Sequence, residues 1–561
     1  MVESYPELYE TFRWHVPKGF NLANACCFQW SGLPGHEQRP ALIFENRAGH
    51  TDMVTFAELG KVSAQLANGL VRLGVIPGDR VVIMMSNPSD LLTALLACWA
   101  VRAVAVPMNA LNSADALLPR LKQARSQVAL IDAANQGEAL AAIAKCPRIK
   151  HIVGIDVYDG RVMSWRGLIA RQPAIYVPSQ CLPSDPALMV WPDHALPDIE
   201  PQSALVLAHQ SLIGQLPGFV MTSNWFPDQA RQVLTTLKPW EESGLLAAIL
   251  PALYFGHTVV LTDRLPAAAN LPSQVTHIVT TGSHLIDALK TDPVNVPTPQ
   301  PVSGLAVLDQ TLHHQWREQS AKLYGAQPNL ATFVSGCGLL ISQCHRKWPD
   351  EPAHSSGYLV PGHHVRLANK SDQSSESNGQ TGELEISRVD RAGQTDPAQF
   401  VQAWPFKDTL DLSTVLPDWW RTGIYAQDLG NGHWRVLGQV QHWHRMSQQP
   451  LSLSELEQAV LLDHQIKWAE VAFMPNKKSP YDEHEIWVLV DTGPTQERLF
   501  KAWRDGMRLD IINRILQTTQ LDQDSVKIRV GLVDRHSLPL TDPHSRSAWH
   551  TRAYQALVDF L

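Results

Sequence analysis

TFAELGKVSAQLANGLVRLGVIPGDRVVIMM, residues 55–85, is the stretch of sequence that decides the fold. Apolar side chains recur in it at the spacing of one helix face: Phe56, Leu59, Leu66, Leu70 and Leu73. Gly74 and the Pro-Gly-Asp turn at 77–79 end the helix, and the apolar run from Val81 to Met85 then predicts a buried strand. The stretch therefore predicts a helix that leads through a tight turn into a strand.

The same alternation continues towards the C-terminus. An apolar helix is predicted over about Leu91 to Ala100, and strands over Ala103 to Pro107 and Val128 to Asp132. A second cycle of helices and strands runs from Leu245 to Leu323. Alternating buried strands and helices indicate a parallel sheet that is covered on both faces. We therefore predict an α/β fold with two layered sheets.

The pattern changes in the last third of the chain. From Gly357 to Leu437 the sequence shows short alternating stretches between polar loops, which predict a small β subdomain. Beyond Gly438, helix and strand patterns of a compact α+β module follow. We predict a large N-terminal domain of residues 1–438 and a small C-terminal domain of residues 439–561.

Composition narrows the classes of function. The chain has 561 residues, of which 44% are hydrophobic and 18% charged, and its net charge of -8 disfavours binding to nucleic acid or to an anionic membrane surface. No apolar run approaches the length of a membrane span. The polar, acidic start and the seven scattered cysteines predict a cytoplasmic protein with buried thiols.

Several short sequence motifs along the chain resemble those of a known family. They are Tyr9 to Pro17, Thr55 to Leu59, Gly214 to Phe219, Leu250 to Gly256, Gly357 to Gly362, Thr422-Gly423 and Gly438. In this order they resemble acyl-CoA synthetases of the medium-chain type, members of the adenylate-forming, AMP-binding superfamily. The resemblance implies a mobile C-terminal domain with a hinge just after Gly438. It also implies a reaction in which ATP activates a carboxylate as an acyl-adenylate, and coenzyme A then receives the acyl group.

The first motif of that family differs in this chain. The resemblance implies a glycine-rich loop ending in Lys-Gly near residues 191–208, whose backbone N–H groups and lysine hold the ATP phosphates. In this chain the corresponding segment begins with Trp191 and Pro192. Its acidic residues, such as Asp198, would repel phosphate. His194 among these acids is a weak candidate for a metal ligand, because no recognised ligand spacing surrounds it.

Four further motifs of that family also differ in this chain. The Thr-Glu pair that would meet the adenylate phosphate and hold magnesium aligns with Gln327 and Pro328, after Tyr324-Gly325. The ribose-binding aspartate aligns with Ile424, which cannot accept a hydrogen bond. An arginine near the hinge is replaced by Gln439, and the C-terminal lysine by Ser545.

These differences lead to two hypotheses. The first is a pseudoenzyme without bound ATP or magnesium, which acts as a protein-binding subunit, a scaffold or a sensor of an acyl or CoA-type ligand. Its partner would be another protein or a second copy of the chain. The second is a functional acyl-CoA ligase or acyltransferase with unorthodox chemistry, either with ATP or without it, for example from a preformed thioester.

A replacement catalytic site is not evident from the residue pattern. Candidates are Cys337 between two glycines and the histidine groups His313-His314, His363-His364 and His442 with His444. Without an identifiable base, Cys337 is interpreted as a packed thiol. The histidines are interpreted as surface residues, since adjacent side chains diverge on a helix or a strand.

Overall fold

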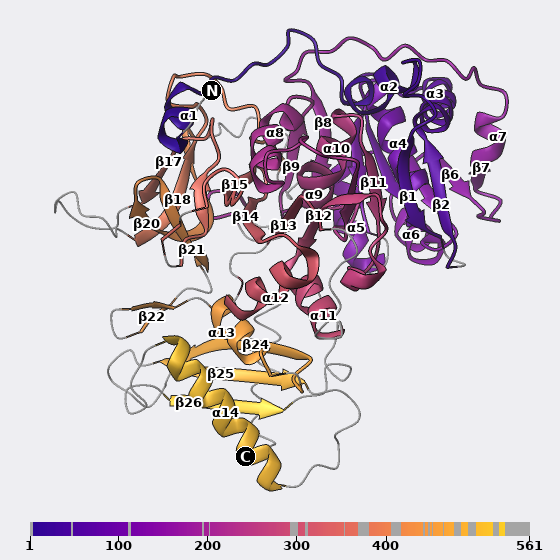
Figure 1. The fold of residues 1–561 in the computed structure, drawn as a ribbon. Coiled ribbons are helices and arrows are strands. Elements are labelled where there is room, and N and C mark those ends of the chain that lie inside the picture. The colour runs from indigo at the N-terminus through magenta and orange to yellow at the C-terminus, as the bar shows by residue number, and fades with distance from the viewer. Residues whose placement is uncertain are drawn as a thin grey trace.

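The chain has two large sheets and a small C-terminal sheet in a computed structural model (Figure 1). This arrangement confirms the predicted α/β fold class. The structure describes residues 4–532 apart from these gaps: 47–48, 110–113, 193–195, 201, 292–300, 309–311, 313, 350, 353, 369–380, 405–416, 441–443, 447–448, 452, 464, 476–483, 492–500 and 520–526.

The first sheet has eight strands in the order β19-β9-β8-β4-β3-β5-β6-β7. Its strands are β3 (Arg80–Met84), β4 (Val104–Pro107), β5 (Val128–Asp132), β6 (His151–Ile155), β7 (Val162–Ser164), β8 (Pro186–Val190), β9 (Ala204–Ala208) and β19 (Gln402–Trp404). The helices in this part of the chain are α3 (Phe56–Arg72), α4 (Pro88–Ala100), α5 (Ala114–Ala124), α6 (Gln136–Ile143) and α7 (Trp165–Ile169). Strands β8, β4, β3, β5, β6 and β7 are parallel, as the alternating pattern predicted.

Helix α3 shows why the opening stretch folds as predicted. The Thr55 hydroxyl accepts a hydrogen bond from the Glu58 backbone N–H at 3.2 Å, and the Glu58 carboxylate accepts one from the Thr55 N–H at 2.9 Å. This reciprocal cap satisfies two backbone donors at the helix start. Gly74 then adopts a φ of +85°, which favours glycine and turns the chain towards β3. The predicted apolar face, including Phe56 and Leu66, is buried.

The second sheet has thirteen strands in the order β17-β18-β20-β21-β16-β15-β14-β13-β12-β10-β11-β1-β2. Its parallel part consists of β1 (Pro40–Glu45), β10 (Gln232–Thr235), β11 (Thr258–Leu261), β12 (Val275–Thr281), β13 (Gly304–Leu308) and β14 (Pro328–Val334). Its antiparallel strands are β2 (Thr51–Thr55), β15 (Gly338–Ser342), β16 (Gly357–Leu359), β17 (Val365–Ala368), β18 (Thr381–Ser387), β20 (Trp419–Gly430) and β21 (His433–Gln439). The longer helices of this part are α8 (Ser211–Thr222), α11 (Gly282–Thr291) and α12 (His314–Tyr324).

Short helical segments complete the N-terminal part: α1 (Tyr5–Thr11), η1 (Asn24–Phe28), α2 (Gln29–Ser31), α9 (Glu242–Gly244), η2 (Leu245–Ile249), α10 (Leu250–Tyr254) and η3 (Ala268–Asn270). The largest hydrophobic cluster contains residues from both sheets, including Val81 of β3, Val233 of β10 and Trp420 of β20. The two sheets therefore share one core, to which α3, α4 and α8 contribute.

The predicted small β subdomain is not separate. Its strands continue the large sheet, because β15 pairs antiparallel with β14, and β16 pairs antiparallel with β15 and β21. Strand β19 instead joins the first sheet beside β9. Local alternation indicates that a segment is a strand, but it carries no information about which strand is its partner. That is the physical reason for the difference.

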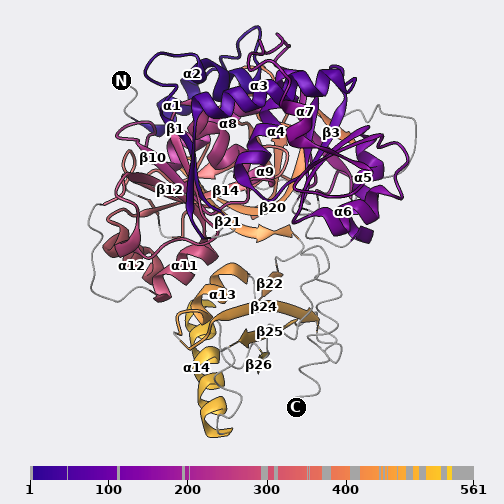
Figure 2. The same cartoon turned by 90° about the vertical axis from the view of Figure 1, so that its right-hand side faces the viewer.

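The C-terminal part lies below the large sheets in Figures 1 and 2 and has a core of its own. Its elements are β22 (His444–Met446), β23 (Gln449–Leu451), α13 (Leu453–Val460), β24 (Trp468–Pro475), β25 (His484–Asp491), α14 (Lys501–Thr519) and β26 (Lys527–Leu532). Strand β21, the last of the large sheet, ends at Gln439.

Lys290 of α11 links the N-terminal part to the C-terminal part. Its ammonium group donates a hydrogen bond to the Ile466 carbonyl at 2.6 Å and lies 5.9 Å from the centre of the Trp316 ring. Burial lowers the pKa of Lys290 to about 8. Among the helices that the structure describes, none is both long and apolar enough to cross a lipid bilayer.

Glu351, in the loop between β15 and β16, is a largely buried carboxyl group. One of its oxygens accepts a hydrogen bond from the Gln343 amide at 2.6 Å, and burial raises its pKa from 4.5 to about 7. Because the folded-state pKa is the higher one, the stability that this group contributes is complete below pH 4.5 and is lost as the pH rises through 7.

The substitution Glu351→Gln should therefore stabilise the protein in alkaline buffer, since glutamine keeps an oxygen for Gln343 and carries no charge. We expect a melting temperature roughly 2–4 °C above that of the wild type at pH 8 and no gain at pH 5. Thermal unfolding at both pH values measures this difference. Glu10→Gln, at an exposed position on α1, is the matched control and should show no such dependence. Equal curves for the wild type and Glu351→Gln at pH 8 would contradict the prediction.

Candidate functional site

The carboxyl ends of the parallel strands β10, β12, β13 and β14 meet at one edge of the thirteen-stranded sheet. In open α/β sheets, ligands bind beyond this edge, where the loops leave the strands. The candidate site is therefore made from the segments that follow these strands, together with the neighbouring loop that follows β8 and the strand β20 that pairs with β21.

Three polar side chains cluster where β10 and β12 end. The hydroxyl groups of Thr236 and Thr280 lie 2.8 Å apart, and Nδ1 of His284 lies 2.8 Å from the Thr236 hydroxyl. Both threonines are buried, and burial lowers the pKa of His284, which therefore favours the neutral imidazole. The cluster offers hydrogen-bonding groups without a fixed charge at the edge where ligands bind.

The turn after β14 is held by buried polar groups. The Gly336 backbone N–H donates to the Glu242 carboxylate at 2.8 Å. The Gln215 side chain donates to the Cys337 carbonyl at 2.8 Å and accepts from the Leu339 N–H at 3.0 Å. Gly338 has a φ of +90°, and a Cβ there would lie 1.9 Å from the Gln215 oxygen. Only glycine fits this position, so the backbone of the turn is rigidly placed.

The predicted phosphate-loop segment begins where β8 ends. The Trp191 indole donates to the Gln123 side chain at 2.7 Å, and the Arg120 guanidinium lies 5.3 Å from the centre of its ring. Trp191 and Pro192 are half-buried, and His194 lies outside the described residues. The start of this segment is therefore attached to helix α5.

A salt bridge attaches the same segment to β20. The Asp198 carboxylate accepts hydrogen bonds from the Arg421 backbone N–H at 2.6 Å and from two guanidinium nitrogens at 3.0 and 2.8 Å. This pairing raises the pKa of Arg421. From the sequence, Asp198 was interpreted only as a charge that repels phosphate, whereas the structure uses it to place the segment next to β20.

Ile424 and Gln439 are brought together by the structure. They are directly opposite each other in the antiparallel pair β20–β21. Ile424 is buried, with 1% of its surface exposed, and its backbone N–H donates to the Thr422 hydroxyl at 3.2 Å. Ser545 lies outside the described residues.

Gln327 and Pro328 lie at the opposite edge of the sheet. Tyr324 ends helix α12, and its hydroxyl donates to the Pro266 carbonyl at 2.9 Å. Pro328 is the first residue of β14, so it marks the amino end of that strand. At the carboxyl end of the same strand the chain continues into Ser335 to Gly338. The structure therefore separates Gln327 and Pro328 from the edge that carries Thr236 and His284.

The histidine groups differ in their surroundings. His314 is exposed beside Glu318, at 3.7 Å, and the ring of His364 lies 4.9 Å from the Trp419 ring. His363 is not a surface residue as we had interpreted it, because it is buried next to Asp396. His313, and the side chains of His442 and His444, lie outside the described residues.

Known proteins match parts of this chain in sequence. A family model for AMP-binding enzymes matches residues 30–191. The acetyl-coenzyme A synthetase of Pasteurella multocida is 29% identical over 199 residues, which are 32% of this chain and 30% of that protein. The mitochondrial acyl-coenzyme A synthetase ACSM5 of Mus musculus is 32% identical over 139 residues, which are 24% of each chain. Each match spans less than a third of the relative's own length.

Solved structures match over nearly the whole chain. The anthranilate CoA ligase AuaEII, in complex with anthranoyl-AMP, has a TM-score of 0.76 at 16% identity, over 97% of this chain and 99% of the ligase. ATP-bound MatB from Rhodopseudomonas palustris has a TM-score of 0.71 at 16% identity, over 92% and 95%. This chain therefore shares the overall fold of these two solved proteins.

Our expectation that the protein binds neither ATP nor magnesium is contradicted. A model of AMP-binding enzymes matches residues 30–191, and a protein with this fold is solved with ATP bound. The expectation relied on side chains missing from short motifs. Backbone groups and residues from several loops together hold a ligand at the edge of an α/β sheet, so the side-chain differences alone do not decide whether the site binds a nucleotide.

The Asp198–Arg421 salt bridge predicts a measurable coupling between the segment after β8 and strand β20. Both side chains are partly exposed, so we expect a coupling free energy of about 0.5–1 kcal/mol that decreases in high salt. A double-mutant cycle with Asp198→Asn and Arg421→Gln, followed by urea unfolding, measures it. Arg366→Gln, on strand β17 of the same sheet, replaces Arg421→Gln in the control cycle. Fully additive effects of Asp198→Asn and Arg421→Gln would contradict the pairing.

Proposed function

We propose that the protein is a functional acyl-CoA ligase, which activates a carboxylic acid with ATP and transfers the acyl group to coenzyme A. The observation that carries this proposal is the fold match to AuaEII, a CoA ligase solved with an acyl-adenylate, over 97% of the chain. The match includes both the large sheets and the C-terminal part. A pseudoenzyme has less support, because the matched relatives are named as synthetases and ligases.

The candidate site would carry out this ligase reaction with residues other than those that the family resemblance implies. The Ile424 side chain is apolar and buried at the position where the resemblance implies a carboxylate for both ribose hydroxyls, so hydrogen bonding to the ribose cannot come from this side chain. The polar cluster of Thr236, Thr280 and His284 and the fixed turn after β14 supply other hydrogen-bonding groups at the same edge of the sheet. The chemistry is therefore proposed to be that of the family with weaker recognition of the ribose.

The activity is tested by following pyrophosphate release and acyl-CoA formation with ATP, magnesium, coenzyme A and a panel of aliphatic and aromatic carboxylic acids. We expect turnover with at least one acid. The variant His284→Ala should lower kcat/KM about tenfold or more, because it removes a hydrogen-bonding group at the site. His314→Ala, exposed on α12, is the matched control and should leave kcat/KM unchanged. Absence of turnover and of ATP binding by calorimetry would contradict the proposal.

Replacement of the ribose-binding carboxylate by Ile424 predicts an unusual nucleotide preference. ATP and 2′-deoxy-ATP should support the reaction with kcat/KM values within about threefold of each other, since no carboxylate at this position discriminates between them. A ligase that paired both hydroxyls would lose roughly 1–3 kcal/mol, or about 5- to 150-fold, with the deoxynucleotide. Steady-state kinetics with both nucleotides distinguish these outcomes, and a preference for ATP above about tenfold would contradict the prediction.

A protein partner or a homo-oligomer, and a cytoplasmic location, stay predictions from the sequence. Size-exclusion chromatography with light scattering on the purified chain tests self-association directly.

A further inference from the structure

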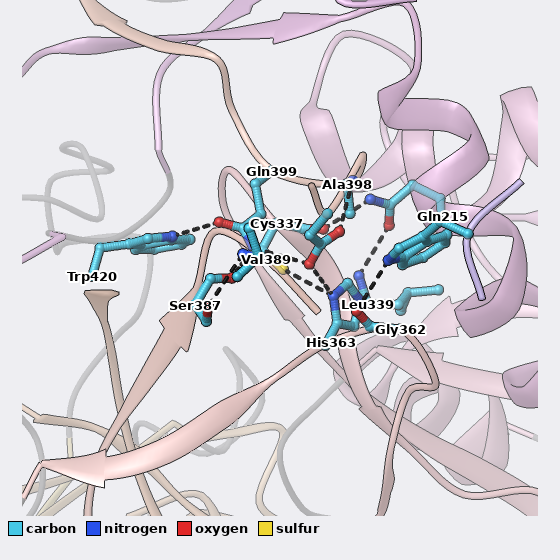
Figure 3. A network of polar contacts seen from close by, with 12 residues as sticks. Gln215, Cys337, Leu339, Gly362, His363, Ser387, Val389, Ala398, Gln399 and Trp420 are labelled. Carbon is cyan, nitrogen blue, oxygen red and sulfur yellow. Dashed lines mark hydrogen bonds and ion pairs between the residues drawn. The ribbon is translucent and has the colours of Figure 1, made fainter. Parts of the chain in front are cut away.

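Three buried side chains that commonly bind metal ions converge beneath the turn after β14. The Cys337 sulfur, Nδ1 of His363 and a carboxylate oxygen of Asp396 all lie within 4.8 Å of one another. Nδ1 of His363 is 2.7 Å from the Asp396 carboxylate and 4.0 Å from the Cys337 sulfur. The three side chains belong to separate segments, which follow β14, β16 and β18 respectively. Figure 3 shows Cys337 and His363 facing each other across this cluster.

The direction of approach excludes a catalytic relay. In a Cys-His-Asp relay, the acid and the nucleophile bind opposite nitrogens of the imidazole ring. Here the thiol and the carboxylate both approach the same nitrogen, Nδ1. They therefore surround the position that a single proton or a single metal ion bound to Nδ1 would occupy.

The carboxylate is oriented by a chain of hydrogen bonds. Asp396 accepts from the Ala398 backbone N–H at 3.0 Å and from the Gln399 amide at 2.9 Å. Gln399 in turn accepts from the Trp420 indole at 2.9 Å and donates to the Ser387 carbonyl (Figure 3). Outer hydrogen bonds of this kind typically hold the ligands of protein metal sites in place.

The other two groups are also fixed. The Tyr9 hydroxyl donates to the His363 carbonyl at 2.8 Å, and the Trp14 ring packs edge-on against the imidazole with 6.0 Å between ring centres. The Cys337 peptide is held by the Gln215 side chain. No more than 2% of the surface of Cys337, His363 or Asp396 is exposed, so water is excluded from the cluster.

Charge balance favours a divalent ion in this environment. A divalent cation bound by one thiolate, one carboxylate and a neutral imidazole has no net charge, and a neutral assembly is the least costly to bury. Arg388, whose guanidinium lies 4.1 Å from the centre of the Phe400 ring, interacts electrostatically with both Cys337 and Asp396.

We propose that Cys337, His363 and Asp396 bind a divalent transition-metal ion of the zinc type. Two ligands of a tetrahedral zinc ion lie roughly 3.3–3.6 Å apart, because each is about 2.0–2.3 Å from the metal. The observed separations of 2.7 and 4.0 Å bracket this value, and the third pair lies within 4.8 Å, so shifts of up to roughly 1 Å complete the geometry. Thiolate and imidazole select zinc over magnesium, so this site is distinct from one that binds a magnesium nucleotide.

The proposal is independent of the ligase activity and has its own test. The full chain is expressed with added zinc, dialysed, and analysed by mass spectrometry of its metals. We expect about one tightly bound zinc per chain. Cobalt added during expression should give a thiolate-to-metal absorption band, and X-ray absorption of the zinc-loaded wild type should show one sulfur ligand.

Variants locate the ion on these residues. Cys337→Ser, His363→Gln and Asp396→Asn should each lower the zinc content at least tenfold, whereas Cys344→Ser, another buried cysteine outside the cluster, should retain it. The proposal would be overturned by wild-type protein that contains no zinc or by an X-ray absorption spectrum without a sulfur ligand. An equal loss of zinc from Cys344→Ser would also overturn it. The wild-type spectrum decides the question even if a cluster variant does not fold.

Discussion

The parallel hydrogen-bonding of β11, β10, β12, β13 and β14 is the constraint on which the rest of the structure depends. Every peptide group in these buried strands needs a partner, so their register and direction are fixed once the sheet forms. Their carboxyl ends then lie at one edge, and each segment that leaves this edge is brought next to the others. Thr236, His284 and the turn after β14 meet there, although they are far apart in the sequence.

The sequence predicts the elements better than their partners. The cap of α3, its buried face and the glycine at position 74 are local signals, and the structure reproduces them. The strands between Gly357 and Leu437 were also predicted as strands. Their membership of the thirteen-stranded sheet was not, because pairing depends on distant surfaces that local alternation does not encode.

The site was predictable only in part, for the same physical reason. Asp198 and Arg421 are 223 residues apart, and neither has a sequence neighbour that indicates the pair. His363 looked like half of an exposed doublet, while Asp396, 33 residues later, was unremarked. The expectation of lost nucleotide binding rested on several nucleotide-binding motifs that differ together. A sheet edge instead combines backbone and side-chain groups from many segments, so missing residues were weaker evidence than the intact frame.

The contact of Lys290 with Ile466 has a consequence for tolerance to substitution. The acceptor is a backbone carbonyl, so almost any residue at position 466 that preserves the local backbone can keep the hydrogen bond. The donor is a side chain, and few residue types at position 290 are long enough to replace it. Substitutions are therefore tolerated unequally at the two ends of this contact, which depends on the identity of residue 290 and only on the backbone of residue 466.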